Sequence, residues 1–249
     1  MTTNNTDIYF MRRASVRVFD KNRHIDDSTL RQIVELASHA PNTGNMQLYS
    51  VVVTRGQELK TELAALHFNQ PAATGADVLL TVCADTRRFA AWCNAREAKS
   101  GLDNFGGRLS AVVDASIFAQ QIVTIAELSG IGCCYLGTAT YNVDAFCKAL
   151  DLPAGVIPVV GIAMGYPAAS ASPSDRLPVD AVLHLEKFTD YTPEQIDAYY
   201  KEKESLPESA GFISMNGKKT LAQVYADIRY PRDLNESVGQ AMLKHMSQV

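Results

Sequence analysis

The chain has 249 residues, of which 47% are apolar and 20% are charged, so it can bury a sizeable core as one large domain or as a compact domain with an extension. Its net charge is −4 and its basic residues form no long run, which argues against binding to nucleic acid or to an anionic membrane surface. The polar first ten residues lack the apolar core of a signal peptide, and no apolar stretch approaches the ~20 residues of a membrane span.

The cysteines indicate a reducing compartment. There are five of them, an odd number, without Cys-x-x-Cys spacing or neighbouring histidine pairs. We therefore expect neither a disulfide framework nor a metal site, and we expect a soluble protein of the cytoplasm. Cys83, Cys133 and Cys134 lie in strand-like runs and are expected to pack as small buried residues.

The first half of the chain alternates predicted helices with short apolar strands. Asp26 and its neighbours can cap a helix whose apolar residues recur at helical spacing, and Pro41 ends it. In chain order we expect this helix between residues 28 and 41, a strand at 48–54, a helix at 58–66 and a strand at 77–84. The segment 86–108 is mixed in character and is expected to be a mobile covering element.

A long run at residues 109–128 is apolar on almost every side. A helix without a clean polar face has to be buried in a core or an interface, and we judge this one too short and too polar for a membrane. After it we expect a strand at 133–136, a helix at 143–150 and a strand at 156–164. This order predicts an α+β fold in which helices cover a central sheet.

The character of the chain changes after about residue 185. The expected elements are a helix opened by Pro193, a polar stretch at 203–219, and amphipathic helices at 221–245 broken at Pro231. A segment of ~60 residues with so few large apolar groups would be marginally stable alone. We therefore expect a main domain at residues 1–185 and a helical extension at 186–249 that is not an independent domain.

Polar clusters interrupt this pattern. They are Arg-Ala-Ser-Val-Arg at 13–17, Pro-Asn-Thr-Gly-Asn-Met-Gln at 41–47, Gly-Ile-Gly-Cys-Cys-Tyr-Leu-Gly-Thr at 130–138, and Arg176. Taken singly, the first is usually a solvated basic turn, the second a turn that tolerates positive φ, and the third a helix stop. Their order indicates more, because the separated arginines together suit a small anion.

In this order, between Arg12 and Pro178, the clusters resemble the flavin-binding pattern of the nitroreductase family. The resemblance implies an α+β fold with a central, mostly antiparallel sheet flanked by helices. It implies FMN bound at a homodimer interface that contains the helix at 109–128. It also implies that the C-terminal helical extension wraps the partner subunit.

The resemblance implies a role for each arginine. Arg13 and Arg176 would hold the FMN phosphate, a dianion that forked guanidinium groups bind well. Arg17 would lie near the pyrimidine edge of the ring, where its positive charge favours the reduced flavin. Relatives carry a lysine two residues before the downstream arginine, and here Ser174 leaves Arg176 with less help on the phosphate.

The other implied cofactor-binding residues would surround the ring and the ribityl chain. They are Ala14, Ser15, Gln70, Tyr135, Leu136, Gly137 and Thr138 of one subunit, with Asn42 and Asn45 of the other. The backbone amides of residues 136–138 would face the N5 edge of the ring. Ser15 would bond to the phosphate or to the ribityl chain.

The implied activity is an NAD(P)H-dependent flavin oxidoreductase. NADH or NADPH would reduce FMN, and a small nitroaromatic, quinone or flavin acceptor would take the two electrons in a second, ping-pong step. No catalytic acid or base is expected, since the histidines fall outside the clusters and are more often surface or packing residues; they are His24, His39, His67, His184 and His245. No Gly-x-Gly-x-x-Gly motif follows a strand, so a separate Rossmann nicotinamide site is not expected.

Two other functions stay open at this stage. A flavin-sequestering module could use the same phosphate clamp without turnover. A specialised relative could dehalogenate or cleave one substrate beneath an ordered lid. The segment 86–107 and the C-terminal arm would decide between them.

Overall fold

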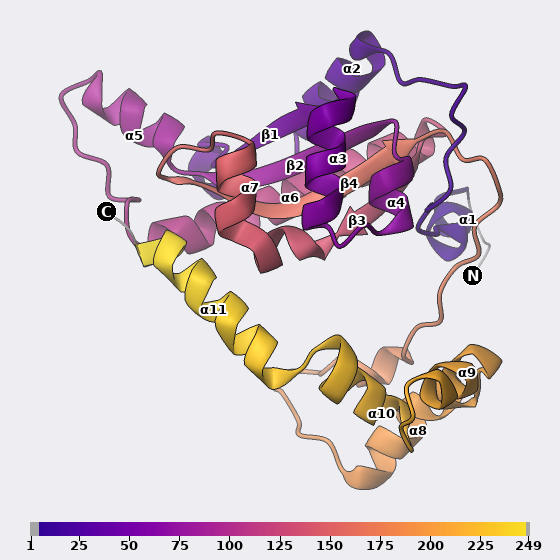
Figure 1. Ribbon diagram of the computed structural model, residues 1–249. Coiled ribbons are helices and arrows are strands. Elements are labelled where there is room, and N and C mark those ends of the chain that lie inside the picture. Colours follow the sequence, from indigo (N-terminus) through magenta and orange to yellow (C-terminus); the bar gives the residue numbers. More distant parts are fainter. Residues whose placement is uncertain (1–4, 248–249) are drawn as a thin grey trace. The chain divides into compact units, whose positions relative to one another are not determined.

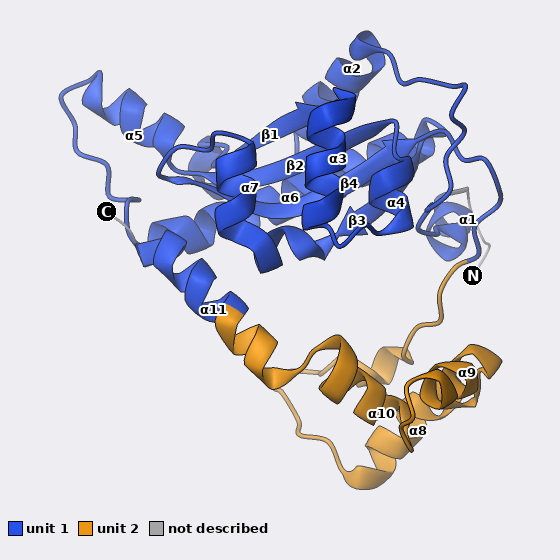
Figure 2. Ribbon diagram, in the orientation of Figure 1, with its two compact units in different colours: residues 1–172, 238–249 blue, residues 173–237 orange. Residues whose placement is uncertain are grey.

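The computed structural model describes residues 5–247 (Figure 1). The chain forms two compact units, one of residues 1–172 and 238–249 and the other of residues 173–237 (Figure 2). The contacts thus divide the chain before Pro173, whereas the expected main domain ran to residue 185. Residues 1–4 and 248–249, which the expected ranges include, lie outside the described residues. That the extension cannot fold alone stays a prediction.

A four-stranded antiparallel sheet forms the centre of the first unit. Its strands are β1 (Tyr49–Thr54), β2 (Val78–Asp85), β3 (Gly132–Leu136) and β4 (Val156–Gly165), in the spatial order β1-β2-β4-β3. Every neighbouring pair is antiparallel, and Cys133 of β3 stands opposite Met164 of β4. The predicted strands and the predicted α+β class are confirmed.

The first unit also contains helices. In chain order they are α1 (Asn5–Arg12), α2 (Asp27–Ala37), α3 (Gln57–Leu66), α4 (Pro71–Gly75), α5 (Arg87–Asn94), α6 (Phe105–Leu128) and α7 (Val143–Ala149), with single turns η1 (Thr43–Asn45) and η2 (Gly137–Asn142). Of these, α2 and α6 cover one face of the sheet and α3, α4 and α7 the other. Asp26 caps α2 as expected, since its carboxylate accepts a hydrogen bond from the Thr29 amide at 2.7 Å. The segment 86–108, expected as a mobile cover, contains the whole of α5 and the start of α6.

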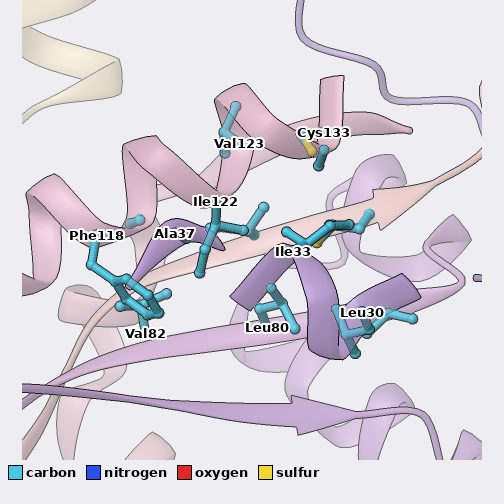
Figure 3. Packing of buried hydrophobic residues seen from close by; sticks show 14 of the residues in the cluster. Leu30, Ile33, Ala37, Leu80, Val82, Phe118, Ile122, Val123 and Cys133 are labelled. Carbon is cyan, nitrogen blue, oxygen red and sulfur yellow. The ribbon is translucent and has the colours of Figure 1, made fainter. Parts of the chain in front are cut away.

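The two faces of the sheet carry separate cores because successive strand residues point to opposite sides. On one face Leu80 and Val82 of β2 pack with Ile33 of α2 and with Phe118 and Ile122 of α6 (Figure 3). The other core contains side chains of α3, α4 and α7, which lie in front of the sheet in Figure 1; they include Leu63, Ala72 and Phe146. The sheet is therefore the middle of three layers.

Helix α6 is apolar on both of its sides. Its inner side is buried against the sheet and α2, while Phe105, Leu109, Val113 and Ile117 are exposed at intervals of four residues. The judgement that this segment is too short and too polar for a membrane was wrong, because by length and composition α6 could cross one. Its inner side nevertheless packs in a protein core, where 44% of its most apolar 18-residue stretch is buried.

The second unit consists of short helices. They are η3 (Val179–Ala181), α8 (Pro193–Ser205), α9 (Pro207–Met215), α10 (Leu221–Val224), the π-helical turn η4 (Tyr225–Arg229) and the first turns of α11 (Arg232–Ser247). Pro193 opens α8, and the predicted break occurs at Pro231, but α9 replaces part of the expected polar stretch. The end of α11 belongs to the first unit, where the His245 carbonyl accepts a bond from Arg108 and Met246 is buried.

Gly132 lets the segment after Arg13 pack against β3. A Cβ at residue 132 would lie 2.7 Å from the Cβ of Val16, well inside van der Waals contact. We expect Gly132→Ala to lower the free energy of unfolding by about 1–3 kcal/mol, the usual cost of overpacking. Urea denaturation measures this. In the control Gly239→Ala, no described atom lies within 4 Å of the new Cβ, and an equal loss there would contradict the explanation.

Candidate functional site

The arginine-containing segment 13–17 is held along β3. The Val16 amide donates to the Cys133 carbonyl at 2.9 Å, and the Ala168 amide donates to the Val18 carbonyl at 3.1 Å, beyond the end of β4. Burial raises the pKa of the Cys134 thiol, and the positive charges of Arg17 and Arg13 act against that shift. Both guanidinium groups therefore lie close enough to β3 to influence its side chains.

Arg13 makes an ion pair with the central helix. Its Nη2 lies 3.1 Å from Glu127 Oε1, and the Tyr9 hydroxyl donates to Glu127 Oε2 at 2.8 Å. Burial, followed by this bond to Glu127, raises the pKa of Tyr9 to about 12. These three residues and Arg12 line a cavity of about 420 Å³ in the first unit. The Glu127 carboxylate thus orients the Arg13 side chain.

The rest of this segment is more open. Ala14 and Ser15 are half-buried, while Arg17 is exposed and its Nη1 donates to the Ser15 carbonyl at 3.4 Å. Because Arg17 donates to the backbone carbonyl of Ser15, the Ser15 hydroxyl takes no part in this hydrogen bond. Arg17 and Ser15 thus lie next to each other on the outer side of β3.

A second group of predicted residues meets at the end of β3. Gln70 Nε2 donates to Thr138 Oγ1 at 3.2 Å and to the His67 carbonyl at 3.1 Å. The ring nitrogen His67 Nδ1 shares a hydrogen bond with the same Thr138 oxygen at 2.8 Å. Gln70 and Thr138, 68 residues apart in the chain, are therefore brought into direct contact, and His67 joins them.

His67 is 1% exposed, and burial lowers its pKa to about 4. Its ring packs against Phe146 with the ring centres 4.8 Å apart. A Cβ at Gly161 would lie 2.7 Å from Nε2, so the glycine makes room for the imidazole. The imidazole is consequently neutral at neutral pH and fixed in place.

The predicted backbone segment follows directly on β3. Leu136 is buried in the second core, whereas Gly137 is exposed and no described atom lies within 4 Å of the position its Cβ would take. Tyr135 is half-buried, and its burial raises the pKa of the phenol. The end of β3 is thus anchored on one side and open at residue 137.

The loop with Asn42 and Asn45 is held at the opposite edge of the sheet, before β1. Asp114 of α6 is 2% exposed, and its carboxylate accepts hydrogen bonds from the Thr43 amide at 2.9 Å and from the Thr43 hydroxyl at 2.8 Å. Within the loop, the Gln47 amide donates to Asn42 Oδ1 at 3.0 Å. Asn45 is exposed and has a φ of 55°.

Sheet topology separates this loop from the arginine segment in one chain. The loop leads into β1, which is one edge of the sheet, while segment 13–17 lies on β3, the other edge. Arg88 of α5 holds the loop from its own side, donating to the carbonyls of Gln47 and Tyr49. A single chain therefore does not bring Asn42 and Asn45 to Arg13.

Arg176 belongs to the second unit. Its Nη1 donates to the carbonyls of Ser174 and Asp175, at 3.1 and 2.8 Å, and the side chain is exposed. The neighbouring Asp175 accepts a bond from Lys203 at 2.9 Å, which raises the pKa of that lysine. Arg176 lines a cavity of about 780 Å³ within this unit. That it meets Arg13 on a phosphate stays a prediction.

Comparison with known proteins shows the family of this chain. Residues 10–166, more than half of the chain, match the sequence model of the family described as the Nitroreductase family. The chain belongs to the nitroreductase family. A Cr(VI) reductase from Pseudomonas sp. (strain G-1) is 30% identical over 200 residues, which cover 77% of this chain and 82% of that protein.

Two further similar proteins match most of the chain. The FMN reductase (NADPH) of Bacillus subtilis (strain 168) is 27% identical over 212 residues, 80% of this chain and 85% of that protein. A protein from Bacteroides fragilis NCTC 9343 of known crystal structure is 44% identical, with a TM-score of 0.91 over 94% of this chain and 95% of that chain. The predicted family and fold are confirmed.

Sequence reasoning missed three residues that organise the candidate site. His67 was placed outside the clusters, although it contacts Gln70 and Thr138. Neither Glu127 nor Asp114 was assigned a role, yet they hold Arg13 and the Asn42 loop. A charged residue in an otherwise apolar helix was the available signal, because buried carboxylates need partners.

The low pKa of His67 makes the stability of the protein depend on pH. The unfolded chain binds a proton on His67 near pH 6.5, while the folded protein does so only near pH 4. Stability is therefore fully present above pH 6.5 and is lost as the pH falls toward 4, by about 3 kcal/mol from this residue.

We test this with His67→Phe, which keeps a ring but cannot bind a proton. The carboxyl groups titrate in both proteins, so the difference between them isolates His67. Urea denaturation across this range should show wild type losing stability relative to the variant as the pH falls. Parallel curves for the two proteins would contradict the assignment.

Proposed function

We propose that the protein is an FMN-dependent oxidoreductase that uses NADH or NADPH to reduce small acceptors such as nitroaromatics, quinones or flavins in two steps. Family membership supports this, as does the Bacillus subtilis relative, which is named an FMN reductase (NADPH). The observation that carries the proposal is structural. Strand β3 holds the arginine segment along its length, and at its end it leads to Thr138, which contacts Gln70.

The donors along β3 fit FMN. Arg13 supplies a forked guanidinium group beside the strand, which suits a phosphate dianion, and Arg17 supplies a second positive charge there for the ring. Arg176 would complete the phosphate site, and Ala14 and Ser15 would line the ribityl chain. Gly137 is open to approach, since no described atom lies within 4 Å of the position of an added Cβ, and the ring would lie beside the amides of residues 136–138.

When bound, FMN would supply hydride and two-electron chemistry, so the protein needs to bind and orient rather than to act as acid or base. Arg17 would place its charge at the pyrimidine edge of the ring and so favour the reduced form. Gln70 and Tyr135 would fix the ring in its plane. The nicotinamide and the acceptor would use the same open face in turn.

The protein would act as a homodimer. The exposed apolar stripe of α6 supports this, because a contiguous apolar patch on the surface of a protein marks a site of interaction with another surface. Pairing through α6 would allow Asn42 and Asn45 of one subunit to reach the flavin of the other. The C-terminal extension would wrap the partner subunit. We propose a cytoplasmic location, with neither nucleic acid nor membrane as partner.

The cofactor assignment is tested by releasing the chromophore. The purified protein should be yellow and should release FMN on denaturation. Arg13→Ala and Arg176→Ala should each weaken FMN binding by about 1.5–3 kcal/mol, the usual worth of a hydrogen bond to a charged group. The exposed Arg31 of α2 is the control, and its alanine variant should bind as wild type does.

Other outcomes have definite meanings. Release of FAD, or failure to bind FMN after reconstitution, would overturn the proposal. FMN that binds but is reduced by neither NADH nor NADPH would indicate a flavin-sequestering module instead.

The dimer is tested by placing a charge in the exposed stripe of α6. Val113 is 51% exposed, so Val113→Asp should not disturb the core of one subunit. It should nevertheless dissociate the dimer and weaken FMN binding, because an unpaired carboxylate would be buried at the interface. Sedimentation velocity at micromolar concentration measures this. Leu36→Asp, on the exposed side of α2, is the control, and a wild-type protein that is a flavin-loaded monomer would contradict the proposal.

A further inference from the structure

We propose that His67 is a positioning residue for the cofactor: its imidazole fixes the Thr138 hydroxyl, which in turn holds the Gln70 amide with its nitrogen inward and its oxygen available to FMN. This inference rests on the proposed function. It concerns a residue that neither the family pattern nor the sequence analysis placed in the site.

The bonding pattern determines the orientation of Gln70. Its amide nitrogen has two hydrogens, and both are used, one by the His67 carbonyl at 3.1 Å and one by Thr138 Oγ1 at 3.2 Å. The carbonyl oxygen is the atom that these bonds do not use. A hydrogen-bond acceptor is therefore presented, which suits the imide N–H of the flavin ring or a ribityl hydroxyl.

The Thr138 hydroxyl keeps this orientation only while it is itself held. Gln70 donates to its oxygen, and His67 Nδ1 shares one more proton with it at 2.8 Å. The imidazole has little freedom to move, because it is 1% exposed and lies between Phe146 and Gly161. The buried His67 ring therefore restrains the Thr138 hydroxyl, and the hydroxyl in turn restrains the half-buried Gln70 amide.

The experiment measures the Kd of the apoprotein for FMN by quenching of free flavin fluorescence. His67→Phe keeps the ring and removes the nitrogen, while Thr138→Val removes the hydroxyl and keeps the shape. We expect each to weaken FMN binding about tenfold, equivalent to about 1.4 kcal/mol, and the double variant to be no worse than either single variant, because both break the same chain of bonds.

Two conservative variants separate positioning from general damage. His67→Asn can return a nitrogen near the Nδ1 position, and Thr138→Ser returns the hydroxyl, so both should bind FMN within about threefold of wild type. Urea midpoints identify any variant that is merely unfolded. If His67→Phe does not fold, the comparison of Thr138→Val with Thr138→Ser still decides.

The inference is overturned if His67→Phe or Thr138→Val binds FMN as tightly as wild type, or if the losses multiply in the double variant. In those cases wild type still binds FMN, so the proposed function stands. If wild type itself binds no FMN, the proposed function fails, and this inference fails with it.

Discussion

The addition of the segment after Arg13 to β3 is the constraint on which the site depends. One backbone bond, from the Val16 amide to the Cys133 carbonyl, fixes the register of this segment, and Gly132 permits its close approach. Strand β3 pairs with β4 and ends at the turn that carries Thr138, which Gln70 contacts. The Val16–Cys133 bond therefore places Arg13 and Arg17 beside the strand that leads to this contact. Parts of the chain that are distant in sequence are thereby attached to the same strand.

Buried charged and polar groups then orient what the backbone brings together. Glu127 and Asp114 both come from α6, and they hold the Arg13 side chain on one side of the protein and the Asn42 loop on the other. A buried carboxylate is costly unless its hydrogen bonds are satisfied. The long helix therefore acts as a rigid frame for both halves of the proposed site, while its exposed apolar stripe is the surface that would bring a second chain.

Local patterns in the sequence were sufficient for the strands and for most helices of the first unit. The apolar run before Asp85 and the caps around Asp26 depend on neighbouring residues alone, which is why β2 and α2 were predicted within a few residues. Helix α9 was missed because its few apolar residues show no clear periodicity in a polar stretch. Helices α1 and α4 were missed because they have only 8 and 5 residues, too few to show a helical repeat, and α4 begins directly at Pro71.

The contacts of the site were less accessible to sequence reasoning. Arg13 was identified, but its partner Glu127 is 114 residues away, and the Asp114–Thr43 bond spans 71 residues. His67 was passed over because it falls outside the polar clusters, where a histidine is more often a surface or packing residue. It is one here, since it is buried, and the same burial places its nitrogen against Thr138. The burial of His67 and its bond to Thr138 both depend on contacts between residues that are distant in the sequence, so neither can be deduced from the sequence alone.

The central claim is that each flavin site is shared between two chains, with Arg13 from one and Asn45 from the other. Mixed dimers test it most directly. One subunit carries Arg13→Ala and the other Asn45→Gly, a substitution that suits the φ of 55° at this position, and the mixed species is isolated through two different tags.

If the site is shared, the mixed dimer contains one site with both substitutions and one site with neither. It should bind one FMN with the affinity of wild type, although both parent dimers bind weakly. If each chain builds its own site, every site in the mixed dimer carries one substitution, and no wild-type affinity is recovered. That second result would contradict the account.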